Sequence, residues 1–312
     1  MGFRQIYISK ATKLSCSDGQ LVVHRNKEEQ PISFPVEDLD IVFLEDPTAV
    51  VTARLLTELS QKGVAFMVCG SNYLPAAISI PFNGYYKQPE ILKFQFNCLP
   101  SKKNKMWETI IKAKIGNQLC VLENTVKDEN TCELLKAYIA NVKFGDSQNM
   151  EGAAAKAYFR SLFGPTFIRF GDTPISSALN YGYSILTGAL IRSCAFNGLN
   201  GNIGIWHSNM QNANNLACDL VEPFRPVVDY YVYQHMEELT EPLSKEFRHG
   251  LINLVNEYVM VAKKKYQVSY AMEMLVDDYV EYLKTGEISC VHVPTFMVKT
   301  NNDSDECEWR IL

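Results

Sequence analysis

A histidine and two carboxylates near the middle of the chain are the residues best suited to chemistry. His207 ends the run Gly204-Ile205-Trp206-His207, which follows the glycine-containing stretch 198–201. Such a loop is too irregular for a helix, and it could deliver an imidazole to the start of one. The glycines match neither the G-x-G-x-x-G nor the P-loop pattern, so a nucleotide cradle is not indicated. Taken alone, such a histidine is more often a hydrogen-bonded structural residue than a ligand.

Two carboxylates follow His207 along the chain. Asp219 and Glu222 are three positions apart, so a continuous helix would place both on one face. Their apolar neighbours favour a position near the interior, where bare carboxylates would repel each other and lose hydration. A divalent cation would remove both costs, although two solvent-facing polar positions explain the pattern equally well. Pro223 either starts a new helix after Glu222 or kinks the existing one.

A third carboxylate lies in the segment NMEGAAAKAYF, residues 149–159. The small residues of this segment predict a helix along which another backbone packs closely. Glu151 falls in the first turn, where the helix dipole favours an anion. An ordinary N-terminal glutamate is the simpler interpretation when the segment is considered by itself.

Basic residues are concentrated in two runs although the net charge of the chain is −5. Residues 101–114 contain five lysines against one glutamate, and residues 245–265 contain five basic residues against two acidic ones. A solvated face explains either run taken singly. If the runs flank a site, Lys102, Lys103, Lys105 and residues 263–265 would form a phosphate track, and Arg248 could contact DNA.

The elements that must position these residues change in character along the chain. The first 95 residues are predicted to be mainly strands, with a hairpin at Asp18-Gly19, whose residue types suit the positive φ of a two-residue turn. One helix is expected there. Asp46 is its predicted N-cap, Pro47 its first residue, and Gly63 the residue that follows its end. A buried strand is expected at 64–69.

Helical periodicity takes over beyond the proline- and glycine-interrupted stretch 81–103. Helices are expected at 150–162, 175–195, 209–221, 227–238, 244–264 and 270–284. The predicted fold class is therefore α+β and multidomain: a small β-rich N-terminal domain (1–95), a linker (96–103), a larger all-α catalytic domain (104–295) and a polar C-terminal tail (296–312).

Composition excludes some classes of protein. No run approaches the ~20 apolar residues of a membrane span, and the N-terminus lacks the apolar region of a signal peptide, so we expect a cytoplasmic protein without a membrane partner. The nine cysteines stand singly and form no C-x-x-C pair. Buried, reduced thiols are therefore expected, and a structural zinc site is not.

Four motifs in order carry a resemblance to a known family. MEGAAAKAYF, ALNYGYSIL (178–186), GIWHSN and ACDLVEPFRP together resemble the CRISPR-associated integrases of type II systems, the Cas1 family, over essentially the whole chain. The resemblance implies that Glu151, His207 and Glu222 bind Mn²⁺ or Mg²⁺, that Asp219 lies beside the metal, and that Arg225 contacts DNA. Many relatives have aspartate where this chain has Glu222.

The resemblance also implies an activity and partners. New spacer DNA would be inserted into the repeat array when its 3′-hydroxyl attacks a phosphodiester, and endonuclease activity would accompany this reaction. Double-stranded DNA with free 3′ ends, CRISPR repeat DNA, a second copy of the chain and the small ferredoxin-like protein Cas2 would be the partners. The oxygen-rich donor set suits Mg²⁺ or Mn²⁺ better than zinc. A metal nuclease of DNA repair and a catalytically silent DNA-binding scaffold remain as alternatives.

Overall fold

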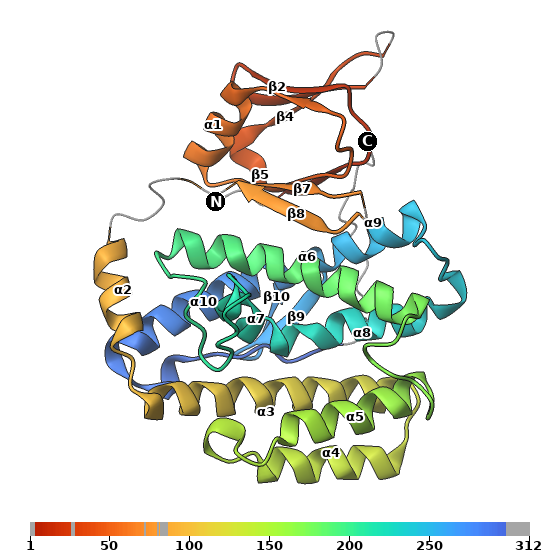
Figure 1. The fold of residues 1–312 in the computed structure, drawn as a ribbon, viewed down its shortest axis with the longest axis vertical. Coiled ribbons are helices and arrows are strands. Elements are labelled where there is room, and N and C mark those ends of the chain that lie inside the picture. Colours follow the sequence, from red (N-terminus) through yellow and green to blue (C-terminus); the bar gives the residue numbers. More distant parts are fainter. Residues whose placement is uncertain (1–3, 26–28, 72, 80, 82–86, 298–312) are drawn as a thin grey trace. The chain divides into compact units, whose positions relative to one another are not determined.

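The computed structural model describes residues 4–25, 29–71, 73–79, 81 and 87–297. The described residues form two compact units, one up to residue 81 and one from residue 87 to residue 297. The first contains the strands of a β-rich domain and the second is mainly helical (Figure 1). This arrangement confirms the predicted fold class.

One sheet of the first unit is mostly parallel. It has the strand order β1 (Arg4–Ile8), β5 (Leu39–Leu44), β7 (Ala65–Cys69) and β8 (Pro75–Ser79). The first three strands are parallel, and β8 is antiparallel to β7. Every residue of the central strand β5 is buried, as expected for a strand covered on both faces.

A second sheet has the order β4 (Ile32–Pro35), β3 (Gln20–His24), β2 (Lys13–Ser17) and β6 (Val50–Val51). The β2–β3 hairpin turns at Asp18 and Gly19, whose φ angles are 52° and 70°, so the predicted turn is confirmed. Side chains of both sheets and of helix α1 (Ala53–Lys62) share one hydrophobic core, which includes Ile8, Leu14 and Leu55.

The predicted start of α1 is wrong. Thr52, not Asp46, is its N-cap, and the Thr52 hydroxyl accepts from the amide of Leu55. The side chain of Asp46 instead accepts a hydrogen bond from the amide of Thr48 at 2.9 Å. This local hydrogen bond forms a turn, which competes with helix formation. The predicted end is confirmed, since Gly63 closes the helix at φ 78°.

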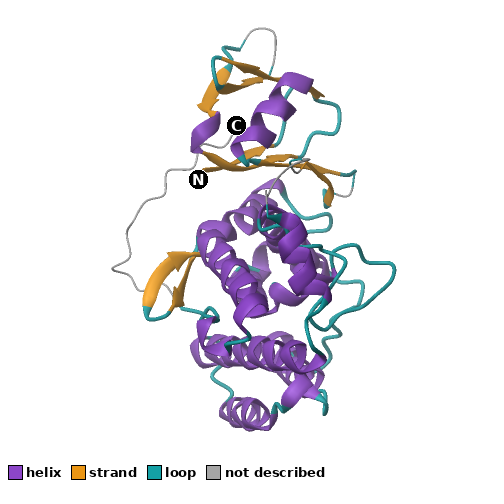
Figure 2. Ribbon diagram, turned by 90° about the vertical axis from the view of Figure 1, so that its left-hand side faces the viewer, coloured by secondary structure: helices purple, strands orange, loops and turns teal. Residues whose placement is uncertain are grey.

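The second unit is a layered set of helices with one small hairpin (Figure 2). Its helices are α2 (Gln88–Phe96), α3 (Pro100–Asn124), α4 (Glu129–Asn141), α5 (Met150–Phe163), α6 (Pro174–Phe196), α7 (Asn215–Leu220), α8 (Arg225–Gln234), α9 (Lys245–Asn253) and α10 (Val268–Thr285). The hairpin consists of β9 (Tyr258–Val261) and β10 (Lys264–Gln267).

Three expectations for this unit differ from the structure. The expected linker 96–103 holds the end of α2 and the first turn of α3, and the division between the units falls after residue 86. The expected helix 209–221 is a loop followed by the short α7. The expected helix 244–264 ends at Asn253, and the hairpin β9–β10 follows. The expected tail, 296–312, lies outside the described residues from 298 onward.

Two expectations from the composition can also be compared with the structure. Of the helices in the described ranges, none is long and apolar enough to cross a membrane. The eight cysteines within those ranges are free thiols, but only four of them are buried as expected: Cys16, Cys69, Cys132 and Cys194.

Candidate functional site

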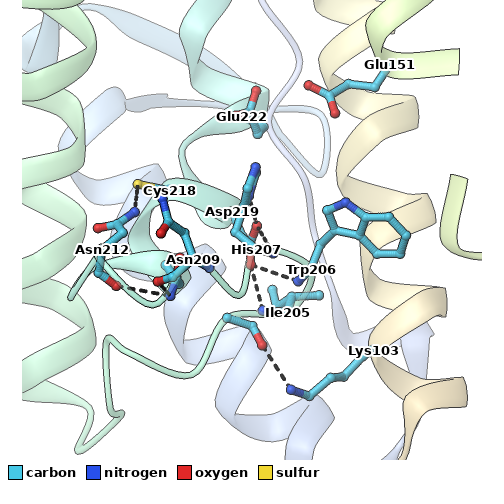
Figure 3. A network of polar contacts seen from close by, with 12 residues as sticks. Lys103, Glu151, Ile205, Trp206, His207, Asn209, Asn212, Cys218, Asp219 and Glu222 are labelled. Carbon is cyan, nitrogen blue, oxygen red and sulfur yellow. Dashed lines mark hydrogen bonds and ion pairs between the residues drawn. The ribbon is translucent and has the colours of Figure 1, made fainter. Parts of the chain in front are cut away.

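The candidate site lies within the second unit. Its side chains come from α3, from the first turn of α5, from the loop before α7 and from the turn between α7 and α8. Figure 3 shows Glu151, His207 and Glu222 gathered on one side of Asp219.

Asp219 fixes the position of His207. Its side chain is fully buried on α7, and its Oδ1 lies 2.5 Å from Nδ1 of His207. The same carboxylate accepts from the backbone amides of Ile205, Trp206 and His207 at 2.6, 2.9 and 3.2 Å. The hydrogen bond to Asp219 raises the pKa of His207. With Nδ1 engaged, Nε2 is the nitrogen left for a ligand, which is the usual arrangement of a metal-binding histidine.

The loop that carries His207 packs tightly against α7 and α3. A Cβ at Gly204 would lie 2.2 Å from the carbonyl oxygen of His207 and 2.8 Å from Asp219 Oδ2, so only glycine fits there. Lys103 donates to the Gly204 carbonyl at 3.0 Å. Trp206 stacks on the buried Trp107 of α3, with ring centroids 5.7 Å apart.

Asn215, the first residue of α7, holds this loop together. The Asn215 amide donates to the carbonyls of Asn202, Asn209 and Asn212, and its Oδ1 accepts from the amide of Asn209. Asn215 is 3% exposed. These contacts give Asn215 a structural role in the loop that carries His207.

Glu222 stands at a change of direction between two helices. α7 ends at Leu220, a 3-10 turn spans Glu222–Phe224, and α8 begins at Arg225, so Pro223 starts a new helical segment. Asn117 of α3 donates to the carbonyl of Pro223 at 2.7 Å and to that of Pro294 at 3.0 Å. The turn is thereby fixed, with the Glu222 side chain only 3% exposed.

Glu151 is positioned by the cap of its own helix. Asp146 accepts from the amides of Met150 and Glu151 at 2.8 and 3.0 Å, and Asn149 accepts from the amide of Gly152. These bonds satisfy amides that the first turn leaves without helical partners. The first turn of α5 therefore presents Glu151 to the site in a fixed way.

A lysine joins the two glutamates. Nζ of Lys114 lies 2.6 Å from Glu151 Oε1 and 2.5 Å from Glu222 Oε2, and its side chain is 7% exposed. Burial alone would lower the pKa of Lys114, but the carboxylates of Glu222 and Glu151 outweigh burial and raise it. Burial would likewise raise the pKa of Glu222, but Arg225 and Lys114 lower it. Lys114 and Glu222 are therefore both charged at neutral pH.

Arg225 pairs with the other oxygen of Glu222. Its Nη2 lies 3.1 Å from Glu222 Oε1, and its guanidinium carbon lies 4.8 Å from the centre of the Tyr183 ring. Its Nε is buried and has no hydrogen-bond partner within the described ranges. Arg225 thus stabilises the position of Glu222, and 29% of its side chain remains exposed.

A cavity of about 450 Å³ opens beside these groups. Glu151, Lys114 and Arg225 line one part of it, and further basic and aromatic side chains line the rest, among them Lys156, Arg160, Arg169, Phe159, Phe167, Phe170 and Tyr183. Phe170 is 90% exposed. Guanidinium groups with aromatic faces suit an anion that carries flat rings, such as a nucleic acid strand.

The donor types at this site fit a hard divalent cation. Two carboxylates and an imidazole oriented by a carboxylate are a set that Mg²⁺ or Mn²⁺ accepts. As the side chains stand, however, no three or more His, Cys, Asp or Glu groups of the described part of the chain are in position to hold a metal. The ammonium of Lys114 lies between the two glutamates instead.

The residues singled out in the sequence fall into three groups. Glu151, His207 and Glu222 converge, and Asp219 and Arg225 act on His207 and Glu222 respectively. Arg248 is elsewhere: it is 6% exposed on α9, and its guanidinium donates to the carbonyl of Leu243. This placement does not favour the DNA contact suggested for Arg248.

Three residues of the site were missed by sequence reasoning. Lys114 was included in a lysine-rich run interpreted as a solvated face, and Asn117 and Asp146 were not considered. The partners of Lys114 and Asn117 lie far away along the chain, so no local pattern indicates them. Asp146 had a weak signal, because an aspartate shortly before a helical segment is a common cap.

Comparisons with known proteins place the chain in a family. The model of the family described as CRISPR associated protein Cas1 matches residues 6–249. The CRISPR-associated endonuclease Cas1 of Neisseria meningitidis serogroup C (strain 8013) is 30% identical over 281 residues, which cover 89% of this chain and 91% of the relative. That of Francisella tularensis subsp. novicida is 25% identical and covers 81% and 85%.

Solved structures share the fold. A casposase bound to its integration product has a TM-score of 0.71 at 20% identity, over 92% of each chain. A Cas1 protein from Thermotoga maritima has a TM-score of 0.71 at 16% identity, over 90% of this chain and 97% of that one. A chain of a Cas6-RT-Cas1–Cas2 complex also gives 0.71, at 19% identity, over 93% of this chain and 36% of that one. From the family model and the Neisseria relative, this chain belongs to the Cas1 family of CRISPR-associated endonucleases.

Proposed function

We propose that this protein is a metal-dependent DNA integrase of CRISPR adaptation in a type II system, with associated endonuclease activity. The observation that carries the proposal is His207, whose Nδ1 is held by the buried Asp219 and whose ring interacts electrostatically with both Glu222 and Glu151. An imidazole that a buried carboxylate orients, together with two further carboxylates, is the donor set of a catalytic cation site.

In the proposed site, Glu151, His207 and Glu222 hold Mg²⁺ or Mn²⁺. The cation would polarise the phosphodiester and stabilise the leaving oxygen. Asp219 keeps the imidazole in the required orientation, and Arg225, whose side chain is 29% exposed and lines the cavity, would contact a phosphate beside Glu222. The nucleophile is the 3′-hydroxyl of the incoming DNA, and water in its place gives hydrolysis.

The partners proposed are DNA with free 3′ ends, CRISPR repeat DNA, a second copy of the chain joined through the β-rich domain, and Cas2. Similar folds occur in a casposase bound to its integration product and in a complex that contains Cas1 and Cas2, which supports this choice. Reaction at a chromosomal repeat array would take place in the cytoplasm.

The test is to measure strand transfer and hydrolysis side by side on one DNA substrate. Both should require Mn²⁺ or Mg²⁺ and should stop with chelator. His207→Ala or Glu222→Ala should cost at least about 10²-fold in rate, because a lost cation forfeits several kcal/mol of transition-state stabilisation. His235→Ala is the matched control, since His235 also pairs with a glutamate but caps the C-terminal end of α8, outside the site.

Each outcome distinguishes the proposal from its alternatives. Hydrolysis without strand transfer would favour a metal nuclease of DNA repair. DNA binding without either reaction would favour a silent scaffold. Full transfer by metal-free protein in chelator would exclude the proposed mechanism.

A further inference from the structure

Lys114 stands where two of the three proposed metal ligands meet. Its ammonium is within 2.6 Å of a carboxylate oxygen of Glu151 and 2.5 Å of one of Glu222, and its side chain is 7% exposed. Lysines are almost never this buried unless they are paired. The contact is therefore part of the site itself and differs from the exposed lysine pairs on the same helix, such as Lys112 with Glu108.

The four charges at this point already balance. Lys114 and Arg225 are positive, Glu151 and Glu222 are negative, and both oxygens of Glu222 contact a cation of the chain. Cations of the chain thus neutralise the buried Glu222 and the partly exposed Glu151. A divalent cation added to this group would leave it with excess positive charge in a poorly solvated place.

A cation bound by Glu151 and Glu222 would need the oxygens that Lys114 now contacts. A divalent ion and an ammonium on the same carboxylate oxygen repel strongly where water is scarce. Lysine has a flexible four-carbon stem, so its ammonium can move without moving the helix. Entry of the metal therefore requires Lys114 to move to another position.

The adjoining cavity offers that position. Lys114 lines the same cavity of about 450 Å³ as Lys156, Arg160, Arg169 and Arg225, against two carboxylates, Glu151 and Asp229. The excess of cations favours an anion in the cavity. A DNA phosphate bound there would both receive the Lys114 ammonium and offset the charge of the metal.

We propose that Lys114 is a positioning residue, a resident counter-cation of Glu151 and Glu222, which moves to a phosphate of bound DNA when the divalent cation binds. Metal and DNA then bind cooperatively: the site holds the metal weakly in free protein and tightly once DNA is present. This inference rests on the metal site of the proposed function. It adds a device that keeps the centre neutral until the substrate arrives.

The test measures Mn²⁺ affinity at one fixed pH, from the electron paramagnetic resonance signal of free Mn²⁺. The full chain is compared with and without a saturating short duplex whose 3′ ends are dideoxy-terminated, so that no reaction occurs, and binding by the DNA alone is subtracted. For the wild type, DNA should tighten Mn²⁺ binding about 10-fold, within the usual range for coupled sites.

Lys114→Met should remove the competitor. Mn²⁺ should then bind about 10-fold more tightly in the absence of DNA, and the further gain on adding DNA should shrink. Lys112→Met is the control, because Lys112 lies on the same helix and pairs only with the glutamate Glu108 among the ion pairs described. It should behave as the wild type.

A charge-preserving variant guards against misfolding, since Lys114→Met removes the cation that Glu151 and the buried Glu222 share and leaves Glu222 only its pair with Arg225 among the ion pairs described. Lys114→Arg keeps the cation, so it should keep weak Mn²⁺ binding without DNA and the gain with DNA. The wild-type comparison also stands alone: equal Mn²⁺ affinity with and without DNA would overturn the inference even if no variant folds.

His207→Ala separates this inference from the proposed function. Mn²⁺ binding that depends on His207 but is unchanged by DNA and by Lys114→Met would leave the metal site in place and overturn the role of Lys114. Mn²⁺ binding that does not depend on His207 at all would overturn the proposed metal site itself.

Discussion

His207 depends on a single carboxylate for both its ring and its backbone. Asp219 contacts the imidazole and the amides of three successive residues with its two oxygens. Because the carboxylate is fully buried, each of these bonds is shielded from competing water. The position of a ligand atom is therefore set by a residue that need not touch the metal.

Asp219→Asn should separate orientation from ligation. An amide supplies one acceptor oxygen in place of two, so either the ring or part of the backbone loses its partner. We expect Mn²⁺ affinity to fall about 10- to 100-fold, the usual cost of losing the partner of a metal-bound histidine. Titration of Mn²⁺ into the variant measures this. Unchanged affinity would mean that the loop positions His207 without Asp219.

Asp229 should make the protein less stable as the pH rises through the mildly acidic range. Burial raises the pKa of Asp229 to about 6, against the favourable hydrogen bond from Tyr183. The folded state then binds this proton more tightly than the unfolded state. The stabilisation is complete below about pH 4, the unfolded pKa, and it is lost as the pH rises to about 6.

Asp229→Asn removes this titration and keeps an acceptor for Tyr183. As the pH rises from 4 to 7, the unfolding free energy of the variant should increase relative to that of the wild type by up to about 3 kcal/mol. Denaturant titrations across this range provide the measurement. Asp128→Asn is the control: the hydrogen bond from Thr131 lowers the pKa of Asp128, so its difference from the wild type should change mainly below about pH 4, in the opposite direction, and stay nearly constant up to pH 7. A difference independent of pH would contradict the assignment.

Helix α3 is the element on which the site is assembled. Trp107, Lys114 and Asn117 lie on one of its faces, at spacings of seven and three residues. They contact the loop that carries His207, both glutamates, and the turn after Glu222. One rigid helix therefore sets the relative positions of segments that are far apart in sequence.

The elements differ in how far local sequence determines them. The Asp18-Gly19 hairpin and the helices α5 and α6 could be predicted, because their turn residues and apolar spacing act within a few residues. Residues 254–267 could not, since strands of four residues give too short a pattern to distinguish from a continuing helix. The convergence of Glu151, His207 and Glu222 came from family resemblance, and Lys114 needed the tertiary structure.

The hairpin β9–β10 gives the second basic run a definite shape. Ala262 and Lys263 form its turn with φ of 48° and 66°, and Lys263 and Lys264 are exposed. If the hairpin binds phosphates, reversing Lys263 and Lys264 to Glu should weaken binding to any DNA sequence. The log–log salt slope should become shallower by about 0.9 for each duplex phosphate that the variant no longer neutralises.

Filter binding at several salt concentrations tests the hairpin. Reversal of Lys136, an exposed lysine on α4 already paired with Glu133, is the control. A slope equal to that of the wild type would return these lysines to the role of a solvated face.

At the scale of the whole molecule, the two units have separate cores and separate proposed tasks. The described core cluster of the first unit runs from Ile6 to Phe66. Every residue of the candidate site lies between Lys103 and Asp229, inside the second unit. The chemistry and the proposed self-association are therefore carried by parts of the chain that can be separated.

A fragment of residues 87–303 should retain the site and lose the dimer. It includes Pro294 and Phe296, whose backbone groups bond to Asn117 beside the Glu222 turn, so the support of that turn is kept. We expect this fragment to bind Mn²⁺ within a few-fold of the full chain, and to be monomeric by light scattering where the full chain is dimeric. A fragment ending at residue 292 is the control: without those partners Asn117 leaves buried polar atoms unpaired, at a cost of about 1–3 kcal/mol each.

A dimeric fragment 87–303 would place self-association in the helical unit. A folded fragment that no longer binds Mn²⁺ would show that the site depends on the β-rich domain.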